Sequence, residues 1–133
     1  MIDGAYHVRS NVPVTVYQFN PLQYTDPSAF SNSFSNDASL LFPTTAWRND
    51  YYVPSWPHTG GSPSQLAVTA WQDNTTVTID VAAGTLPAGG APGFAVGEPQ
   101  AIAMNSGDVL ELATSFGDLT GSRVTSDKPV QVI

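Results

Sequence analysis

The stretch Thr75-Thr76-Val77-Thr78-Ile79-Asp80-Val81 decides the fold class of this chain. Polar and apolar residues alternate along it, so the threonines and Asp80 share one face while Val77, Ile79 and Val81 share the other. Alternation with a period of two is typical of a β-strand with one buried face. We therefore expect a strand over 75–81 whose three aliphatic side chains enter a hydrophobic core.

Similar short segments recur along the whole chain and are separated by turn residues. Eleven Gly and eleven Pro leave no clear amphipathic helical window. The pattern predicts an all-β protein, an antiparallel β-sandwich or barrel-like fold of about nine to eleven short strands, with a propeller-like arrangement as the alternative. Residues 82–99 are read as a long surface loop or an extended hairpin. The other expected strands are 5–9, 14–19, 38–42, 51–56, 65–71, 100–104, 109–113, 119–125 and 129–133.

A ten-residue motif occurs twice, at 8–17 and at 124–133. At an offset of 116 residues, five of the ten positions are identical, a valine, a serine, a proline and two further valines. We interpret residues 1–133 as a single β-rich repeat module in which 124–133 opens a next repeat. Val14, Val16, Val130 and Val132 are all expected to point into the core, because alternation places them on one face.

The end of the second copy, 131–133, carries no charge, proline or other residue that protects an edge strand. We expect it to pair with a next repeat or with a neighbouring subunit, or else internally with the first copy. The residues expected to form the turns and corners of the fold are Ser10, Pro13, Asp37, Asp73, Asn74, Asp118, Gly121, Ser126 and Pro129. The Asp side chains would bond to nearby backbone N–H groups.

Composition excludes several classes of partner. The net charge is −7 with four cationic side chains, so neither a nucleic-acid backbone nor an anionic membrane is an expected partner. No apolar run approaches the roughly 18 residues of a transmembrane helix. The absence of Cys excludes disulfides and Cys-ligated metals in these residues. We expect no metal site and no cofactor, although calcium held by several loops stays open.

Catalytic chemistry has weak support in the sequence. His7 is expected on a strand surface and His58 in an exposed loop. A glycosidase needs two carboxylates about 5–10 Å apart, and spacing alone does not pair Glu98 or Glu111 with any Asp. No nucleophile-elbow motif is present. We therefore expect no catalytic residues.

Aromatic side chains are the better candidates for ligand binding. The candidates are Trp56, Tyr51, Tyr52 and Tyr24, whose rings can stack on sugars or anchor a protein partner. Trp56 follows Ser55 beside a Gly-rich loop and is expected to be the most exposed of them, whereas Trp71 ends an apolar strand and is expected to be buried.

Four stretches resemble, in order, the N-terminal domain of the IgG Fc-binding protein family. They are Tyr-Gln-Phe-Asn-Pro (17–21), Asn-Asp-Ala-Ser-Leu-Leu-Phe-Pro-Thr-Thr (36–45), Asp-Asn-Thr-Thr-Val-Thr-Ile (73–79) and Asp-Leu-Thr-Gly-Ser-Arg-Val-Thr-Ser-Asp-Lys-Pro-Val (118–130). The chain is similar to the versions in large secreted or surface proteins of bacteria. The resemblance implies an extracellular, all-β, non-catalytic module.

Three functions follow as hypotheses. The first is an extracellular or cell-surface structural or adhesion module of a larger protein, which binds protein or glycan partners or assembles into an array. The second is a carbohydrate-binding module attached to an enzyme, which exposed tyrosines and Trp56 in a planar row would favour. The third is a hydrolase domain, which requires a cleft where carboxylates converge with His7 or His58.

Overall fold

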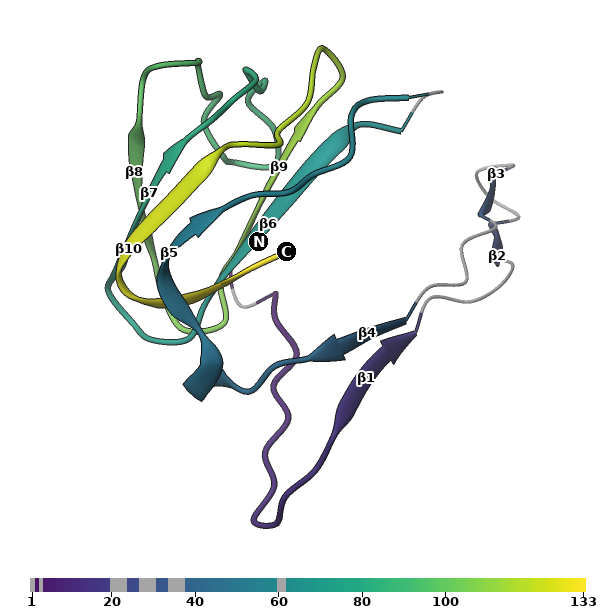
Figure 1. Ribbon diagram of the computed structural model, residues 1–133, viewed down its shortest axis with the longest axis vertical. Coiled ribbons are helices and arrows are strands. Elements are labelled where there is room, and N and C mark those ends of the chain that lie inside the picture. The colour runs from purple at the N-terminus through teal and green to yellow at the C-terminus, as the bar shows by residue number, and fades with distance from the viewer. Residues whose placement is uncertain (1, 3, 20–23, 27–30, 34–37, 60–61) are drawn as a thin grey trace. The chain divides into compact units, whose positions relative to one another are not determined.

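The computed structural model describes residues 2, 4–19, 24–26, 31–33, 38–59 and 62–133. These residues contain ten strands and one short 3-10 helix, so the chain is almost entirely β, as the sequence predicts. The chain divides into two compact units: unit 1 comprises 1–7 and 44–133, and unit 2 comprises 8–43. Each is described here by itself (Figure 1).

Unit 1 is an antiparallel sheet that curls around a hydrophobic core. After the 3-10 helix η1 (Thr44–Ala46), its strands are β5 (Arg48–Tyr52), β6 (Ser64–Ala70), β7 (Thr75–Asp80), β8 (Gln100–Met104), β9 (Val109–Thr114) and β10 (Arg123–Val132). The pairing order is β8-β7-β10-β6-β9, and β5 also pairs with β10. The fold is therefore the barrel-like antiparallel arrangement that composition and periodicity predict, and not the propeller-like alternative.

Strand β10 organises this sheet by changing neighbours halfway along its length. Its first residues pair with β7 on one side and β5 on the other, and its last residues pair with β6. The register against β5 shifts between Thr125 and Val130, where Pro129 offers no backbone N–H. Figure 1 shows β10 running beside β7 and then bending away. Two strands, 119–125 and 129–133, are expected in this region, whereas the structure has one bent strand.

The tight turn after β6 sends the chain from one neighbour of β10 to the other. Asn74 in this turn has a positive φ of 54°, a conformation that asparagine tolerates. Consecutive strands β6 and β7 therefore pair with different halves of β10. Their inward faces meet in one core.

The core of unit 1 follows the alternation of its strands. In β7 the valine and isoleucine positions expected to be inside are buried, and Val81 follows them. β6 contributes every second residue in the same way. The buried hydrophobic residues are Val53, Leu66, Val68, Ala70, Val77, Ile79, Val81, Phe94, Met104, Leu110, Leu112, Leu119, Val124 and Val130.

The loop between β7 and β8 is an extended hairpin, one of the two forms expected. Isolated bridges join Thr85 to Phe94 and Ala88 to Ala91. The Phe94 side chain is buried and anchors this hairpin on the core. Gly93 approaches the carbonyl oxygen of Thr85 so closely that a Cβ atom there would lie 2.9 Å from it.

One edge of the end of β10 is paired within unit 1, with β6. Ala67 N donates to Ile133 O (2.8 Å) and Ile133 N donates to Ala67 O (3.0 Å). These bonds extend the β6–β10 ladder to the last residue. The second copy of the repeated motif thus belongs to the sheet of unit 1, where it pairs with β5, β6 and β7.

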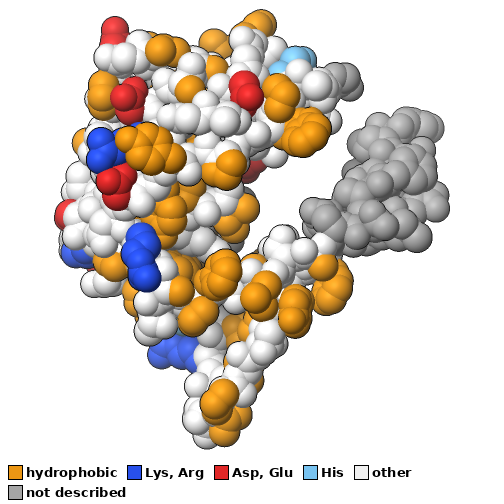
Figure 2. All heavy atoms as spheres, in the orientation of Figure 1, with side chains coloured by type: hydrophobic (Ala, Val, Ile, Leu, Met, Phe, Trp, Pro, Cys, Tyr) orange, Lys and Arg blue, Asp and Glu red, His pale blue; other side chains and the backbone are white. Residues whose placement is uncertain are grey.

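Unit 2 contains two small two-stranded sheets. β1 (Val16–Phe19) pairs with β4 (Ala38–Leu41), and β2 (Tyr24–Asp26) pairs with β3 (Ser31–Ser33). Tyr17 and Phe19 lie on one face of β1, with ring centroids 6.2 Å apart, and both are exposed. Figure 2 shows hydrophobic side chains exposed along β1 and β4.

Two expectations for the first copy of the motif are wrong. Residues 5–9 are not a strand in the structure. Val14 is 59% exposed and Val16 is half-buried, whereas Val130 is fully buried and Val132 packs against the core. The reason is that the strands that surround β10 have no counterparts around residues 8–15 in the described part of the chain.

Candidate functional site

A row of exposed side chains follows β5 and the segment after it. Asp50, Tyr52, Pro54 and Trp56 are exposed, while the residues between them turn inward. The side chains of Tyr52 and Trp56 are 71% and 76% exposed. Since residues two apart on an extended chain share a face, these four side chains form one surface. We call it the β5 outer row.

The segment after β5 is held rigidly although it is not a regular strand. Val53 N donates to Ser122 O (2.9 Å), Gly121 N donates to Val53 O (2.8 Å) and His58 N donates to Gly117 O (3.2 Å). The Thr120 hydroxyl accepts from Ser55 N (3.0 Å) and donates to Ser55 O (2.9 Å). These bonds continue the β5–β10 register, so hydrogen bonds to residues 117–122 hold the backbone on both sides of Trp56.

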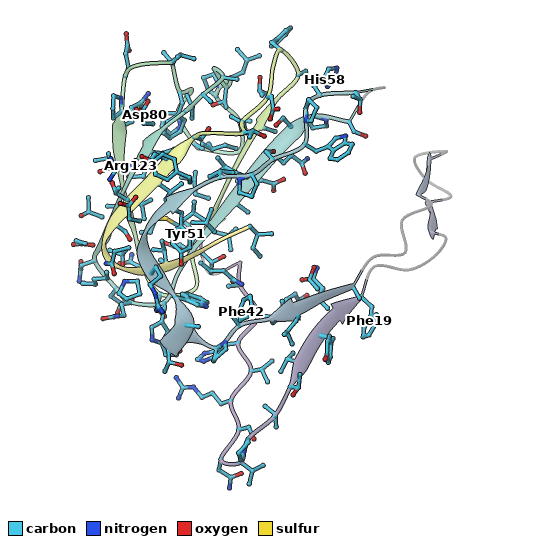
Figure 3. All side chains as sticks on the ribbon, in the orientation of Figure 1. Phe19, Phe42, Tyr51, His58, Asp80 and Arg123 are labelled. Atoms are coloured by element: carbon cyan, nitrogen blue, oxygen red, sulfur yellow. The ribbon has the colours of Figure 1, made fainter. Side chains whose placement is uncertain are left out.

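An ion pair lies beside Tyr52 in this row. The Arg123 guanidinium donates to both carboxylate oxygens of Asp50, at 3.0 and 2.8 Å, and lies 5.7 Å from the centroid of the Tyr52 ring. Figure 3 shows Arg123 at the start of β10. The hydrogen bonds from Arg123, followed by its charge, lower the pKa of Asp50, and the same pair raises the pKa of Arg123. The pair fixes the Arg123 side chain against the aromatic ring.

Asp50→Asn should make the melting temperature of the protein change less with pH in the acid range. The pKa of Asp50 is lowered in the folded state, so its stabilisation is present above the unfolded pKa and is lost as the pH falls through the folded pKa. The melting temperatures of wild type and variant should therefore differ most near neutral pH and converge in acid. Both groups are solvent-exposed, so we expect a small difference that high salt reduces further. A difference that grows in acid would contradict the assignment.

Tyr51 lies on the opposite side of β5 from the outer row (Figure 3). Its hydroxyl donates to Val130 O (2.7 Å) and accepts from Arg48 N (2.7 Å), and its ring packs against the core. These contacts join β5 to the bent part of β10. Tyr51 therefore supports the row rather than forming part of its surface.

Two other candidate residues cannot be assigned to this surface. Tyr24 begins β2 in unit 2, and its side chain lies outside the described residues. Asp37 also lies outside the described residues. The structure thus brings together Tyr52 and Trp56 from the candidate set, and adds Arg123, which the sequence analysis does not select.

His58 is not in an exposed loop as expected. It is half-buried, and its Nδ1 atom is buried with no hydrogen-bond partner. Its backbone bond to Gly117 places the segment after Trp56 next to Phe116, whose side chain is 83% exposed. Sequence reasoning missed Phe116, because nothing in the neighbouring Ser115 and Gly117 marks its ring as exposed. Trp71, expected to be buried, is half-buried with the His7 ring edge-on at 4.7 Å.

Several of the residues expected at corners have side chains that bond to backbone groups, some of them far away along the chain. Asp118 Oδ1 accepts from Thr120 N (2.8 Å), and Asp73 Oδ1 accepts from Ser106 N (3.1 Å). Asn74 N donates to the side chain of Asn105 (3.1 Å). Gly121 has a φ of 90°, which a side chain would strain. These residues shape the loops around the core.

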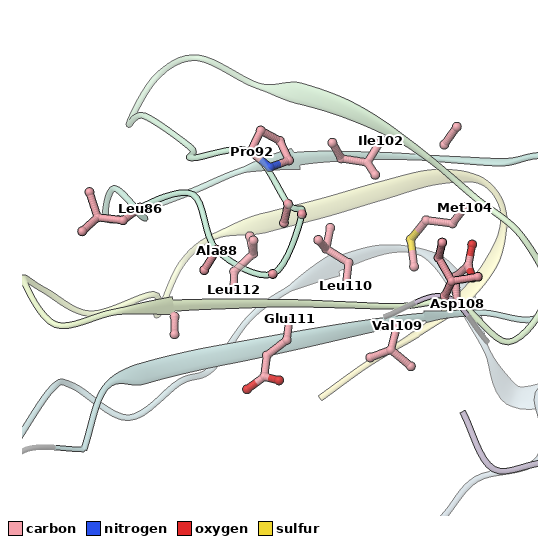
Figure 4. Close-up of a pocket in the computed structure, with 16 residues that line it drawn as sticks. Leu86, Ala88, Pro92, Ile102, Met104, Asp108, Val109, Leu110, Glu111 and Leu112 are labelled. Carbon is pink, nitrogen blue, oxygen red and sulfur yellow. The ribbon is translucent and has the colours of Figure 1, made fainter. Parts of the chain in front are cut away.

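A groove lies between β8 and β9 under the extended hairpin (Figure 4). It is an open groove of about 570 Å³, lined mainly by apolar residues. Asp108 and Glu111 belong to its lining, but neither histidine does. In Figure 4 the Glu111 side chain points away from Leu110 and Leu112. The convergence of carboxylate and histidine that a hydrolase requires is absent from this groove.

The part of the chain that the structure describes contains neither a metal-binding cluster nor a membrane-spanning helix. Within it, no three His, Asp or Glu side chains gather closely enough to hold a metal ion. None of the described helical segments has the length and apolar character needed to cross a membrane. The exposed aromatic row is thus the stronger candidate for recognition.

Comparison with protein families identifies one match. Residues 37–133 match the family model described as IgGFc binding protein. The matched range contains β4 and all of unit 1 from η1 onward. Neither the curated proteins nor the solved structures contain a match to the chain.

Proposed function

The chain belongs to the IgGFc binding protein family, and on that premise we propose that it is an extracellular, non-catalytic binding module of a larger surface or secreted protein. Its docking surface is the β5 outer row with Arg123. The partner is a protein. The observation that carries the proposal is the exposure of Tyr52 and Trp56 on a backbone held by the β5–β10 ladder.

The chemistry of the row suits protein recognition. Trp, Tyr and Arg are the residues most enriched among those that contribute most to binding energy at protein interfaces. Arg123 is already held against the Tyr52 ring by its ion pair with Asp50, so less side-chain entropy is lost on binding. Trp56 offers a large exposed ring at the end of the row. The row therefore combines pre-ordered polar and apolar contacts.

A glycan partner is the second candidate, because exposed rings also stack on sugars. The presence of both Tyr52 and Trp56 on one face favours it. The guanidinium against Tyr52 occupies part of the space around that ring, which reduces the room for a sugar. This geometry supports protein over glycan as the partner.

Trp56→Ala should weaken partner binding while leaving the fold intact. The family name supplies a probe, the Fc fragment of immunoglobulin G, tested by surface plasmon resonance with and without its glycan. We expect both forms of Fc to bind equally, and the variant to lose about 30-fold in affinity, which corresponds to about 2 kcal/mol. Val96→Ala, which truncates an exposed side chain on the extended hairpin, is the matched control and should bind like wild type.

The outcomes separate the candidates. Binding that disappears when the Fc glycan is removed would favour a carbohydrate-binding module. Equal losses in Trp56→Ala and Val96→Ala would move the docking surface away from the β5 outer row. If the wild-type chain binds neither form, Fc is not the partner, and a glycan array then tests the second candidate directly.

A further inference from the structure

The two copies of the repeated motif share a local structure as well as a sequence. In the first copy the Ser10 hydroxyl donates to the carbonyl of Val12 (2.8 Å). In the second copy the Ser126 hydroxyl donates to the carbonyl of Lys128 (2.7 Å), two residues on in the same way. A proline follows each acceptor residue. The corner that lets β10 bend is thus already formed in residues 8–17.

The surroundings of the two copies differ completely. Val124 and Val130 in the second copy are fully buried among β5, β6 and β7. Their counterparts Val8 and Val14 are 66% and 59% exposed. Exposed aliphatic side chains at alternating positions are costly to keep in water, at roughly 25 cal/mol per Å² of apolar surface. The first copy therefore has the sequence of a buried strand in an exposed position.

We propose that residues 8–17 are a closing strand for a second module with the fold of unit 1. In unit 1, β10 fills a slot that has β5 on one side and β6 and β7 on the other. The second module has the same slot but no strand of its own to fill it. Residues 8–17 enter the slot by strand addition. A second copy of this chain is not the occupant, because its slot already holds β10.

The residues around β10 in unit 1 show which contacts the first copy would make in the equivalent slot. Val8 would take the place of Val124, opposite the equivalents of Tyr51 and Ile79. Val14 would take the place of Val130, opposite the equivalent of Ala70. Asn11 would replace Asp127, whose Oδ1 accepts from Thr76 N (2.8 Å), and an Asn side chain offers the same acceptor. Each buried position receives an identical residue.

The main difference lies at position 128. Lys128 Nζ donates to the carbonyl oxygens of Asp73 (2.5 Å) and Asn74 (3.0 Å), and Val12 stands at the corresponding place in the first copy. Both bonds join exposed groups at the surface of the β6–β7 turn. Their loss weakens the slot contacts without placing an uncompensated charge in the core.

The 133-residue chain provides a direct test. Five substitutions, Thr125→Arg, Asp127→Asn, Lys128→Val, Gln131→Thr and Ile133→Tyr, convert 124–133 into the sequence of 8–17. We expect this in-register graft to fold cooperatively with a β-type circular dichroism spectrum. Its melting temperature should lie within about 10 °C of wild type, the shift expected when only surface contacts are lost.

The matched control is a graft displaced by one residue, in which 124–133 take the sequence of residues 9–18. A slip of one residue moves every side chain of a strand to the other face. The displaced graft includes Val124→Arg and Val130→Thr, which place polar groups at two fully buried positions. We expect it not to fold. An unfolded in-register graft would overturn the proposal, and so would a displaced graft as stable as the in-register one, since the slot would then accept any strand.

Discussion

Val130→Asp is expected to prevent unit 1 from folding. The Val130 side chain is fully buried, and its backbone pairs with β6 on one side and β5 on the other. The variant loses the burial of an aliphatic side chain, worth about 1.5–3 kcal/mol, and places an unpaired carboxylate in the core. Together these exceed about 4 kcal/mol, a large part of the stability of a domain of this size.

The first copy of the motif supplies the control for this prediction. Val14→Asp makes the same chemical change at the corresponding residue, but Val14 is 59% exposed. Its melting transition, followed by circular dichroism, should match wild type. Equal loss of structure in the two variants would contradict the different placement of the two copies, and a soluble Val130→Asp protein with wild-type stability would refute the central position of β10.

Tyr51→Phe is expected to destabilise the protein by about 2 kcal/mol, which is the cost of leaving hydrogen-bonding groups without a partner. The Tyr51 hydroxyl is the group that serves both Val130 O and Arg48 N where β10 bends. For a domain of this size the melting temperature should fall by about 10 °C. Chemical denaturation monitored by tryptophan fluorescence measures the change in the free energy of unfolding.

Tyr52→Phe is the neighbouring control for Tyr51→Phe. Tyr52 is 71% exposed, and the Arg123 guanidinium lies over its ring, which phenylalanine retains. Its free energy of unfolding should stay within about 0.5 kcal/mol of wild type, as for most surface substitutions. If the two variants were equally stable, the Tyr51 hydroxyl would have no structural role, and Tyr51 would return to the set of candidate ligand-binding residues.

The candidate surface was partly visible in the sequence. The exposure of Trp56 is expected from its position beside Pro57 and a Gly-rich loop. Tyr52 is a candidate because the stretch 51–56 is rich in aromatic residues. The sequence does not show whether Tyr51 or Tyr52 faces the core, because both lie in the same aromatic stretch, 51–56. Only pairing with β10 shows that one ring faces the core and the other faces solvent. Arg123 joins the surface from a strand more than 70 residues away along the chain, which local pattern does not reveal.

The sequence by itself determines the elements of this protein and the inward residues of its best strands. Period-two alternation at 75–81 specifies which side chains are buried, because a strand places successive side chains on opposite faces. Only the tertiary structure decides whether the valines of the repeated motif are buried or exposed. Identical valines are buried at 130 and exposed at 14, since burial depends on which strands lie around a segment. Those neighbouring strands come from distant parts of the chain, so the sequence of the motif alone does not specify them.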